Sequence, residues 1–197
     1  MTEGTTEFLP LTPAEARELL RIAREAIGAV FGYVAPPAPR CSTRALLARN
    51  GAFVTIRHLG ELRGCVGNIS PDGPLHLTVA TMARAAAFDD PRFPPLAPHE
   101  WATVDIEISR LSSPRRARAE EVIPGRHGLY VVRGPARGLL LPQVAAEHRW
   151  DREEFLRETC RKAGLPSDAW QDPETELLVF EAQVLRERDL EPEETAP

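Results

Sequence analysis

Prolines set the limits of regular structure in this chain, which has 197 residues and contains 19 of them, about twice the average usage. Proline has no backbone N–H and its ring clashes with the preceding helical turn, so a helix cannot run through it. Three prolines fall in Val34–Arg40 and four in Asp89–Pro98. We therefore expect an extended connection over the first segment and a stiff, ordered loop over the second.

Helical patterns lie on both sides of these proline runs. Thr12 can cap a first helix, because Pro13 suits the first helical position and Glu15 can bond back to the cap. The expected buried stripe of this helix is Leu19, Ala23, Ala26, Ile27 and Val30. Further helices are expected over Ser42–Arg49, from Pro74 to a point before Pro91, from Pro142 onward, and over Asp151–Lys162 with Gly164 after its end.

Strands are indicated by alternating and β-branched segments. Val104–Ile108 alternates apolar and acidic residues strictly, as a strand with one wet face does. Two hairpins and a closing strand are also expected: Gly51–Ile56 with Glu61–Ile69, Gly128–Val132 with Leu139–Leu141, and Leu177–Leu185. Helices and hairpins that are intermixed, without repeated strand–helix crossovers, indicate an α+β fold with antiparallel sheets.

Charge and composition argue against several classes of protein. A formal net charge of -5 argues against a nucleic-acid binder, because phosphate contacts need clustered positive charge. The basic cluster Arg115–Arg118 is followed by Glu120 and Glu121, which favours a solvated face over a phosphate site. No segment reaches the roughly 18 consecutive apolar residues that a membrane span needs. The first residues lack a secretory leader pattern and the three cysteines lie far apart, so we expect a cytoplasmic protein with reduced thiols.

The hexapeptide Leu62–Gly67, with the sequence LRGCVG, is the first candidate site. Residues two apart in a strand share a face, so Arg63, Cys65 and Gly67 are expected to point the same way. A guanidinium near a thiol favours the thiolate, which is the nucleophilic form. The alternative interpretation is structural, because a buried cysteine can act as a small hydrophobe and Gly64 and Gly67 can serve tight packing or a bulge.

The proline-rich loop carries a second group of candidates, Asp90, Arg92 and Phe93. Asp90 and Arg92 can form a bidentate pair that holds Phe93 inward, or they can present charge to a ligand. We favour the structural pair, because such a loop needs anchoring.

Two further polar side chains are candidates, and metal binding is not expected. His127 can be a general base on a turn, although an exposed turn histidine is the commoner case. Gln143 can contact a polar ligand or close the end of a strand. The other four histidines share no metal-ligand spacing, and the phosphate-binding glycine patterns are missing, so no metal or cofactor is expected.

Four stretches in order make the chain similar to the AMMECR domain family: Leu62–Gly67, Asp90–Leu96, Gly125–Leu129 and Leu141–Ala145. The resemblance covers residues 11–186 and implies one domain, with residues 1–10 and 187–197 as frayed tails. It implies two lobes of unequal size around a cleft. The larger lobe would be built from both chain ends, the smaller lobe would be inserted, and the cysteine motif would face the cleft.

The resemblance also implies a biological setting. Bacterial and archaeal members are named protein A of the AmmeMemoRadiSam system, which suggests a Memo-like protein and a radical SAM enzyme as partners. An adaptor or regulator is therefore the favoured function. The alternative is an enzyme, or an enzyme subunit, that uses Cys65 as a thiolate nucleophile with Arg63 beside it. The sequence gives no indication of the oligomeric state.

Overall fold

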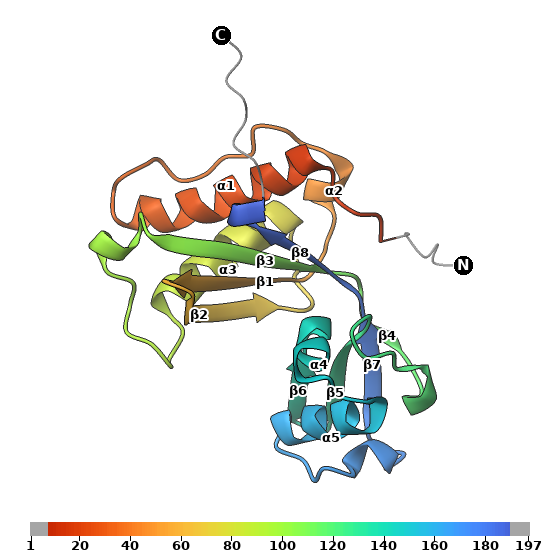
Figure 1. Ribbon diagram of the computed structural model, residues 1–197. Coiled ribbons are helices and arrows are strands. Elements are labelled where there is room, and N and C mark those ends of the chain that lie inside the picture. Colours follow the sequence, from red (N-terminus) through yellow and green to blue (C-terminus); the bar gives the residue numbers. More distant parts are fainter. Residues whose placement is uncertain (1–7, 190–197) are drawn as a thin grey trace. The chain divides into compact units, whose positions relative to one another are not determined.

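The computed structural model describes residues 8–189, which divide into two compact units (Figure 1). The first unit combines the residues up to Arg110 with those from Gln183 onward, and the second is the continuous segment Leu111–Ala182. Helices accompany a four-stranded antiparallel sheet in each unit. The predicted α+β fold with antiparallel sheets is therefore confirmed, while the cleft between lobes stays a prediction.

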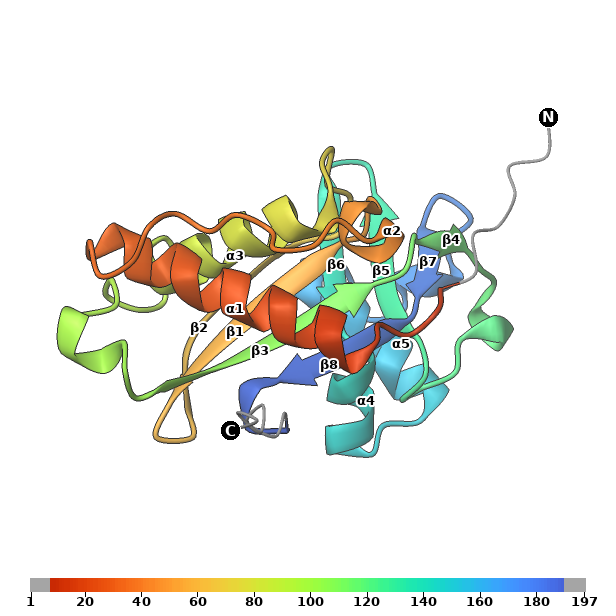
Figure 2. The same cartoon turned by 90° about the horizontal axis from the view of Figure 1, so that it is seen from above.

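The first sheet has the strand order β2 (Glu61–Asn68), β1 (Ala52–His58), β3 (Val104–Leu111) and β8 (Ala182–Arg186). Helices α1 (Pro13–Val30) and α3 (Leu75–Phe88) lie on one face of this sheet, as Figures 1 and 2 show. Helix α1 ends before the first proline run and α3 ends before Pro91, as the sequence predicts. The hairpin of β1 and β2 turns at Leu59 and Gly60, which take positive φ angles of 52° and 87°. The order of the strands leaves β2 at an edge of the sheet.

Helix α1 begins as its sequence predicts. Thr12 accepts a hydrogen bond from the Glu15 amide, and the Glu15 carboxylate accepts one from the Thr12 amide. The predicted stripe is buried except at Val30, which is 47% exposed. Val30 is the last helical residue, and the next residue, Phe31, packs on the core in its place. The prediction for Val30 is therefore wrong.

The second sheet has the strand order β4 (Arg115–Arg116), β7 (Glu176–Phe180), β5 (Gly128–Arg133) and β6 (Ala136–Leu140). Helix α5 (Arg152–Lys162) packs on it through Phe155 and Leu156, which are almost fully buried. Asp151 caps this helix by accepting from the Glu154 amide, and Gly164 takes a positive φ after the helix, where the sequence predicts its end. The basic cluster is exposed, as predicted, and its arginines pair with glutamates.

The expected closing strand is interrupted at Glu181. The Glu181 amide donates to Ser112 Oγ, and the Ser112 amide donates to the Glu181 carbonyl, both at 2.9 Å. The chain therefore leaves β7 in one sheet and enters β8 in the other, so the prediction of one continuous strand is wrong. The short elements are α2 (Arg44–Leu47), α4 (Pro142–His148), and single 3-10 turns at Pro98–Glu100, Ala119–Glu121, Ala169–Gln171 and Glu187–Asp189.

Within residues 8–189, no helix combines the length and the apolar character that a transmembrane segment requires.

Candidate functional site

A β-bulge lies within the hexapeptide. Gly64 pairs with Ile56 and Leu62 pairs with Arg57, so Arg63 is an extra residue in β2 without a partner on β1. A bulge interrupts the alternation of side chains along a strand, which was the basis for placing Arg63 beside Cys65. The structure instead shows the Arg63 guanidinium bound to the proline-rich loop.

Arg63 and Glu100 clamp the end of that loop onto β2. The guanidinium donates to both Glu100 carboxylate oxygens at 2.8 and 2.9 Å, and to the carbonyl oxygens of Pro94 and Pro95. Glu100 also accepts from the Ala97 amide at 2.8 Å. Arg63 lowers the pKa of Glu100 to about 2, so this mostly buried carboxylate is ionised at neutral pH.

Asp90 and Arg92 form a second clamp at the start of the loop. The Arg92 Nε and Nη2 atoms lie 3.0 and 2.7 Å from the two Asp90 oxygens, which confirms the predicted bidentate pair. The Asp90 carboxylate accepts from the Cys65 amide at 2.8 Å, and Arg92 Nη2 donates to the Cys65 carbonyl at 3.3 Å. Arg92 holds the pKa of Asp90 well below its usual range. This pair therefore satisfies backbone groups at the open edge of β2.

The loop does not take Phe93 into the core. Phe93 is half-buried, with the Arg92 guanidinium 5.4 Å from the centre of its ring. Leu96 is the buried residue instead, and its amide donates to the Ala87 carbonyl at the end of α3. The prediction that the ion pair holds Phe93 inward is therefore wrong.

Both glycines of the hexapeptide allow close packing. A Cβ atom on Gly64 would overlap the carbonyl oxygen of Ala86 in α3, and one on Gly67 would overlap the ring of Phe53 on β1. The expected close approach is confirmed at each glycine, and in both cases the neighbour belongs to the protein itself.

The Cys65 thiol is half-buried and faces its cross-strand neighbour. Cys65 pairs with Thr55, whose hydroxyl donates to the sulfur at 3.3 Å. The Cys65 N–H and C=O point to Asp90 and Arg92 rather than to β1, so this is a non-hydrogen-bonded pair, in which side chains come closest together. A hydroxyl donor can stabilise a thiolate, but a threonine cannot act as the base that would form it.

The two other predicted residues lie in the second unit. His127 is 5% exposed, and its Nδ1 accepts from the Ile123 amide at 3.2 Å. Burial lowers its pKa, so it is a neutral imidazole that closes a turn. The interpretation as an exposed turn histidine is wrong. Gln143 lies in the first turn of α4 and is half-buried, and its contact with a ligand stays a prediction.

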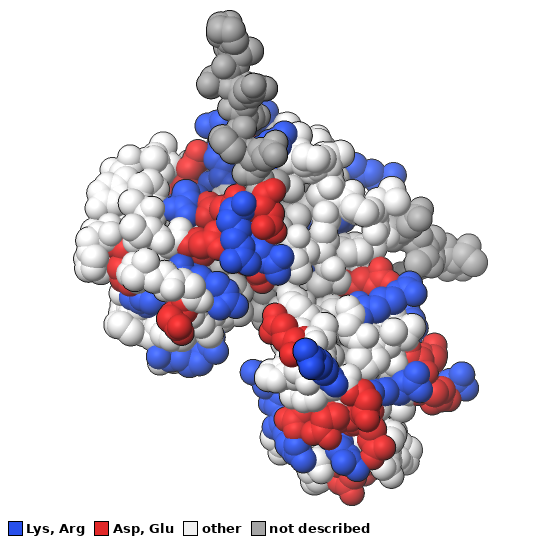
Figure 3. Space-filling view, in the orientation of Figure 1, with Lys and Arg blue, Asp and Glu red and all other residues white. Residues whose placement is uncertain are grey.

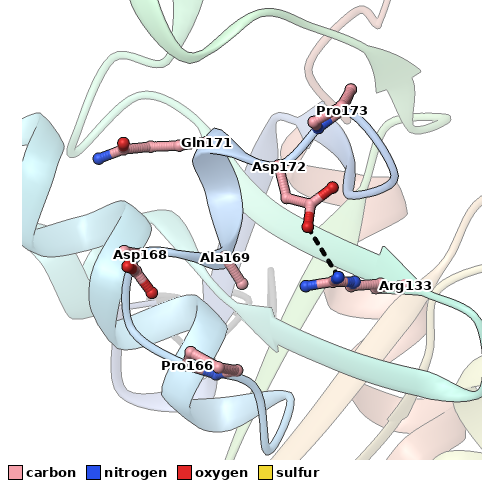
Figure 4. Close-up of a pocket in the computed structure, with 7 residues that line it drawn as sticks. All are labelled: Arg133, Pro166, Asp168, Ala169, Gln171, Asp172 and Pro173. Carbon is pink, nitrogen blue, oxygen red and sulfur yellow. Dashed lines mark ion pairs between the residues drawn. The ribbon is translucent and has the colours of Figure 1, made fainter.

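A shallow recess of about 410 Å³ is also present in the second unit (Figure 4). It is lined by Arg133, Pro166, Asp168, Ala169, Gln171, Asp172 and Pro173. Arg133 is already paired with Asp172 at 2.7 Å, and Figure 4 shows these two side chains pointing toward each other. None of the predicted site residues lines this recess. Across residues 8–189, no three His, Cys, Asp or Glu side chains are grouped so that they could hold a metal ion.

Comparison with known proteins identifies the family. The family model described as AMMECR1 matches residues 20–185. The chain belongs to the AMMECR1 family. A protein from Methanothermobacter thermautotrophicus is 43% identical over 92% of this chain and 98% of its own length. A protein from Aquifex aeolicus is 37% identical over 89% of this chain and 94% of its own length.

A solved structure extends the similarity to the fold. The crystal structure of the uncharacterized protein PH0010 from Pyrococcus horikoshii aligns with a TM-score of 0.79 and 39% sequence identity. The alignment covers 86% of this chain and 90% of that chain. The AMMECR1 fold of this chain therefore has an experimental counterpart.

Sequence reasoning missed two residues of this AMMECR1 site, Glu100 and Thr55. An arginine in a half-buried strand needs acceptors, which was a signal that Arg63 had an acidic partner. The partner is 37 residues away, and the bulge that directs Arg63 toward it has no local sequence signature.

Proposed function

We propose that this AMMECR1 protein is a non-catalytic adaptor or regulator that binds a partner protein through the loop Asp90–Leu96. The observation that carries the proposal is the pair of clamps at Arg63–Glu100 and Asp90–Arg92, which fix an exposed loop on the edge of a sheet. A loop that is ordered before binding loses less conformational entropy on association.

The composition of the exposed loop supports a protein partner. Pro91, Arg92, Pro94 and Pro95 are exposed, and Arg92 lies over the half-buried ring of Phe93. Arginine and aromatic side chains are enriched among residues that dominate binding energies at protein interfaces. Asp90 neutralises Arg92, so the surface presents a paired guanidinium over an aromatic ring rather than a free charge.

The partners follow from the family resemblance. We take them to be the Memo-like protein and the radical SAM enzyme of an AmmeMemoRadiSam system, acting in the cytoplasm. The ionised Asp90 and Glu100 are poor general bases because their lowered pKa values make proton uptake unfavourable. This supports a binding role over catalysis.

Binding of the purified Memo-like protein and radical SAM enzyme from the same genome tests the proposal. Arg92→Ala and Phe93→Ala should each weaken binding to one partner at least about tenfold in titration calorimetry, the loss expected when an interface anchor is truncated. Arg44→Ala removes an exposed arginine from α2 and is the matched control, which should bind as the wild type does. If the wild type binds a partner and both loop variants bind it with the same affinity, the proposal is contradicted.

The second candidate function is an enzyme that uses Cys65. It is favoured by the partial exposure of Cys65 and by the hydrogen bond from Thr55 to its sulfur. Cys65→Ser and Cys65→Ala separate the two functions, because an adaptor should keep its partner-dependent activity in both variants. The rate of Cys65 alkylation against pH adds an independent measurement. A midpoint well below the ordinary thiol value of about 8.5 would support the enzyme, and an ordinary midpoint would support the adaptor.

A further inference from the structure

A charge-free segment covers the last two residues of helix α1 and the connection after it. The eleven residues from Ala29 to Pro39 include no Asp, Glu, Lys or Arg. Tyr33 is 52% exposed and Val30 is 47% exposed, and the segment stays largely exposed up to Arg40. Figure 3 shows a broad area without charged side chains over this end of α1. Contiguous exposed apolar surface of this kind indicates a binding surface rather than ordinary protein exterior.

The first part of the segment forms a rigid aromatic cluster. The ring centres of Phe31 and Tyr33 are 5.5 Å apart, and those of Tyr33 and Trp101 are 5.4 Å apart. Phe31 also meets Phe88 edge to face. Gly28 lets the Trp101 ring lie directly on α1, because a Cβ atom there would be 3.0 Å from the ring. The half-exposed Tyr33 is therefore held in place from below.

The second part of the segment is a proline run that is tied to α1. Arg21 donates to the Ala38 carbonyl at 2.8 Å, and the Arg40 amide donates to Glu18 at 2.6 Å. Between Val34 and Arg40 the chain makes no regular helix or strand and contains Pro36, Pro37 and Pro39. Proline runs favour the extended polyproline II conformation, and such segments bind to aromatic surfaces with a low entropic cost. The segment therefore offers both halves of one recognition pair side by side.

The charges around this segment are already paired within the chain. Arg21 is bound to Glu18 and Glu25, and Arg24 is bound to Glu187. The protein carries a net charge of -5, so two copies repel each other at most orientations. This repulsion is weak at a surface that carries no charge and whose neighbouring arginines are paired with glutamates. The charge distribution therefore does not oppose a second copy of the chain here, and the proline run beside the aromatic cluster makes the surface complementary to itself.

We propose that residues 30–39, together with Trp101, form a self-association surface. The proline run of one copy lies on the Tyr33–Trp101 cluster of the second copy, and the reverse contact follows from two-fold symmetry. This inference is independent of the adaptor function. The surface offers about ten residues a side, whereas a stable interface of standard size needs roughly 20–30. The dimer is therefore weak, with a Kd on the order of 100 µM.

Sedimentation velocity over protein concentrations from about 5 to 500 µM tests the proposal, because this range spans the expected Kd. The wild type should change from monomer toward dimer over this range. Tyr33→Asp places a charge at the centre of the surface and should raise the Kd at least about tenfold. Leu77→Asp is the matched control, since Leu77 is 54% exposed on α3, and it should dimerise as the wild type does.

Hydrogen exchange locates the contact. At high concentration the amides of Tyr33, Val34, Ala35 and Ala38 should exchange more slowly than at low concentration, and circular dichroism should show Tyr33→Asp to be folded. A chain that stays monomeric at about 500 µM overturns the proposal, as does a dimer that Tyr33→Asp leaves intact or whose protection lies elsewhere. The proposal is also overturned if the chain stays monomeric but binds a different protein and Tyr33→Asp abolishes that binding. The surface would then be the binding site for that protein.

Discussion

At the scale of single residues, the hexapeptide Leu62–Gly67 is a packing and anchoring motif. Gly64 admits the end of α3, Gly67 admits the Phe53 ring, and Arg63 grips the proline-rich loop. The Cys65 side chain takes no part in these contacts. The backbone of Cys65 is fixed by Asp90 and Arg92, while its sulfur accepts a hydrogen bond from the Thr55 hydroxyl.

The packing role of Gly64 predicts a large loss of stability on adding one methyl group. Gly64→Ala should lower the free energy of unfolding by about 3 kcal/mol, because the neighbour is a backbone carbonyl that cannot move aside without shifting α3. Urea denaturation measures this loss. Gly73→Ala is the control, because a Cβ atom there meets nothing within 4 Å. Equal stability of the two variants would contradict the packing role.

His127 predicts a dependence of stability on pH. Its folded pKa is lowered by burial, so between the folded and unfolded pKa values the unfolded chain binds more protons. The free energy of unfolding should therefore decrease as the pH falls below about 6.5. Above that pH the stabilisation contributed by the neutral His127 should be complete. Chemical denaturation between about pH 8 and 5 measures the slope. His127→Gln should flatten the slope and His99→Gln, at an exposed site, should keep it. A wild-type slope in His127→Gln would refute this assignment.

At the scale of elements, the helix starts and the hairpin turn could be predicted because they depend on neighbouring residues. The Thr12–Glu15 capping box and the Leu59–Gly60 turn are examples. The clamps depend on distant residues and could be anticipated only in part. Asp90 and Arg92 are two residues apart and were predicted as a pair, whereas Arg63 and Glu100 are 37 apart and were not. The end of β7 depends on Ser112, 69 residues away from Glu181.

The clamp at Arg63 predicts a change in the mobility of the loop. Arg63→Lys keeps the charge but loses the fork that binds Glu100 and two carbonyls together, so amides of the loop should exchange with solvent at least about tenfold faster. Hydrogen exchange of the Phe93 and Leu96 amides measures this effect. Arg116→Lys, in a strongly exposed pair with Glu176, should leave exchange in its surroundings unchanged. Unchanged protection at Leu96 in Arg63→Lys would show that the clamp does not hold the loop.

At the scale of the whole molecule, the two units differ in how the chain builds them. All four strands of the second sheet lie within Leu111–Ala182, together with the core around Phe155. The first sheet needs β8 from the far end of the described chain, and Glu187 there bonds to Arg24 and to the Ile106 amide. The second unit therefore has its complete sheet and core within one continuous segment. The sheet of the first unit is complete only when the chain returns to it with β8.

This difference predicts the behaviour of fragments. Residues 111–182 expressed alone should fold and melt cooperatively, because domains of about this size do so when the core is complete. Residues 1–110 alone should lack a cooperative transition, because β3 loses its neighbour β8 and Arg24 loses Glu187. Differential scanning calorimetry measures the unfolding transition of each fragment, and the chemical-shift dispersion of proton NMR spectra shows whether each is folded. An unfolded 111–182 fragment beside a folded 1–110 fragment would reverse the prediction.

The paired contacts of Ser112 and Glu181 have a consequence for modularity. Two hydrogen bonds hold these residues next to each other, so the 68 residues between them leave and return at a single point. An insertion whose two ends are adjacent disturbs the domain that carries it little. We therefore expect that a short turn or a foreign domain joined at Ser112 and Glu181 would leave the register of β3 and the start of β8 unchanged.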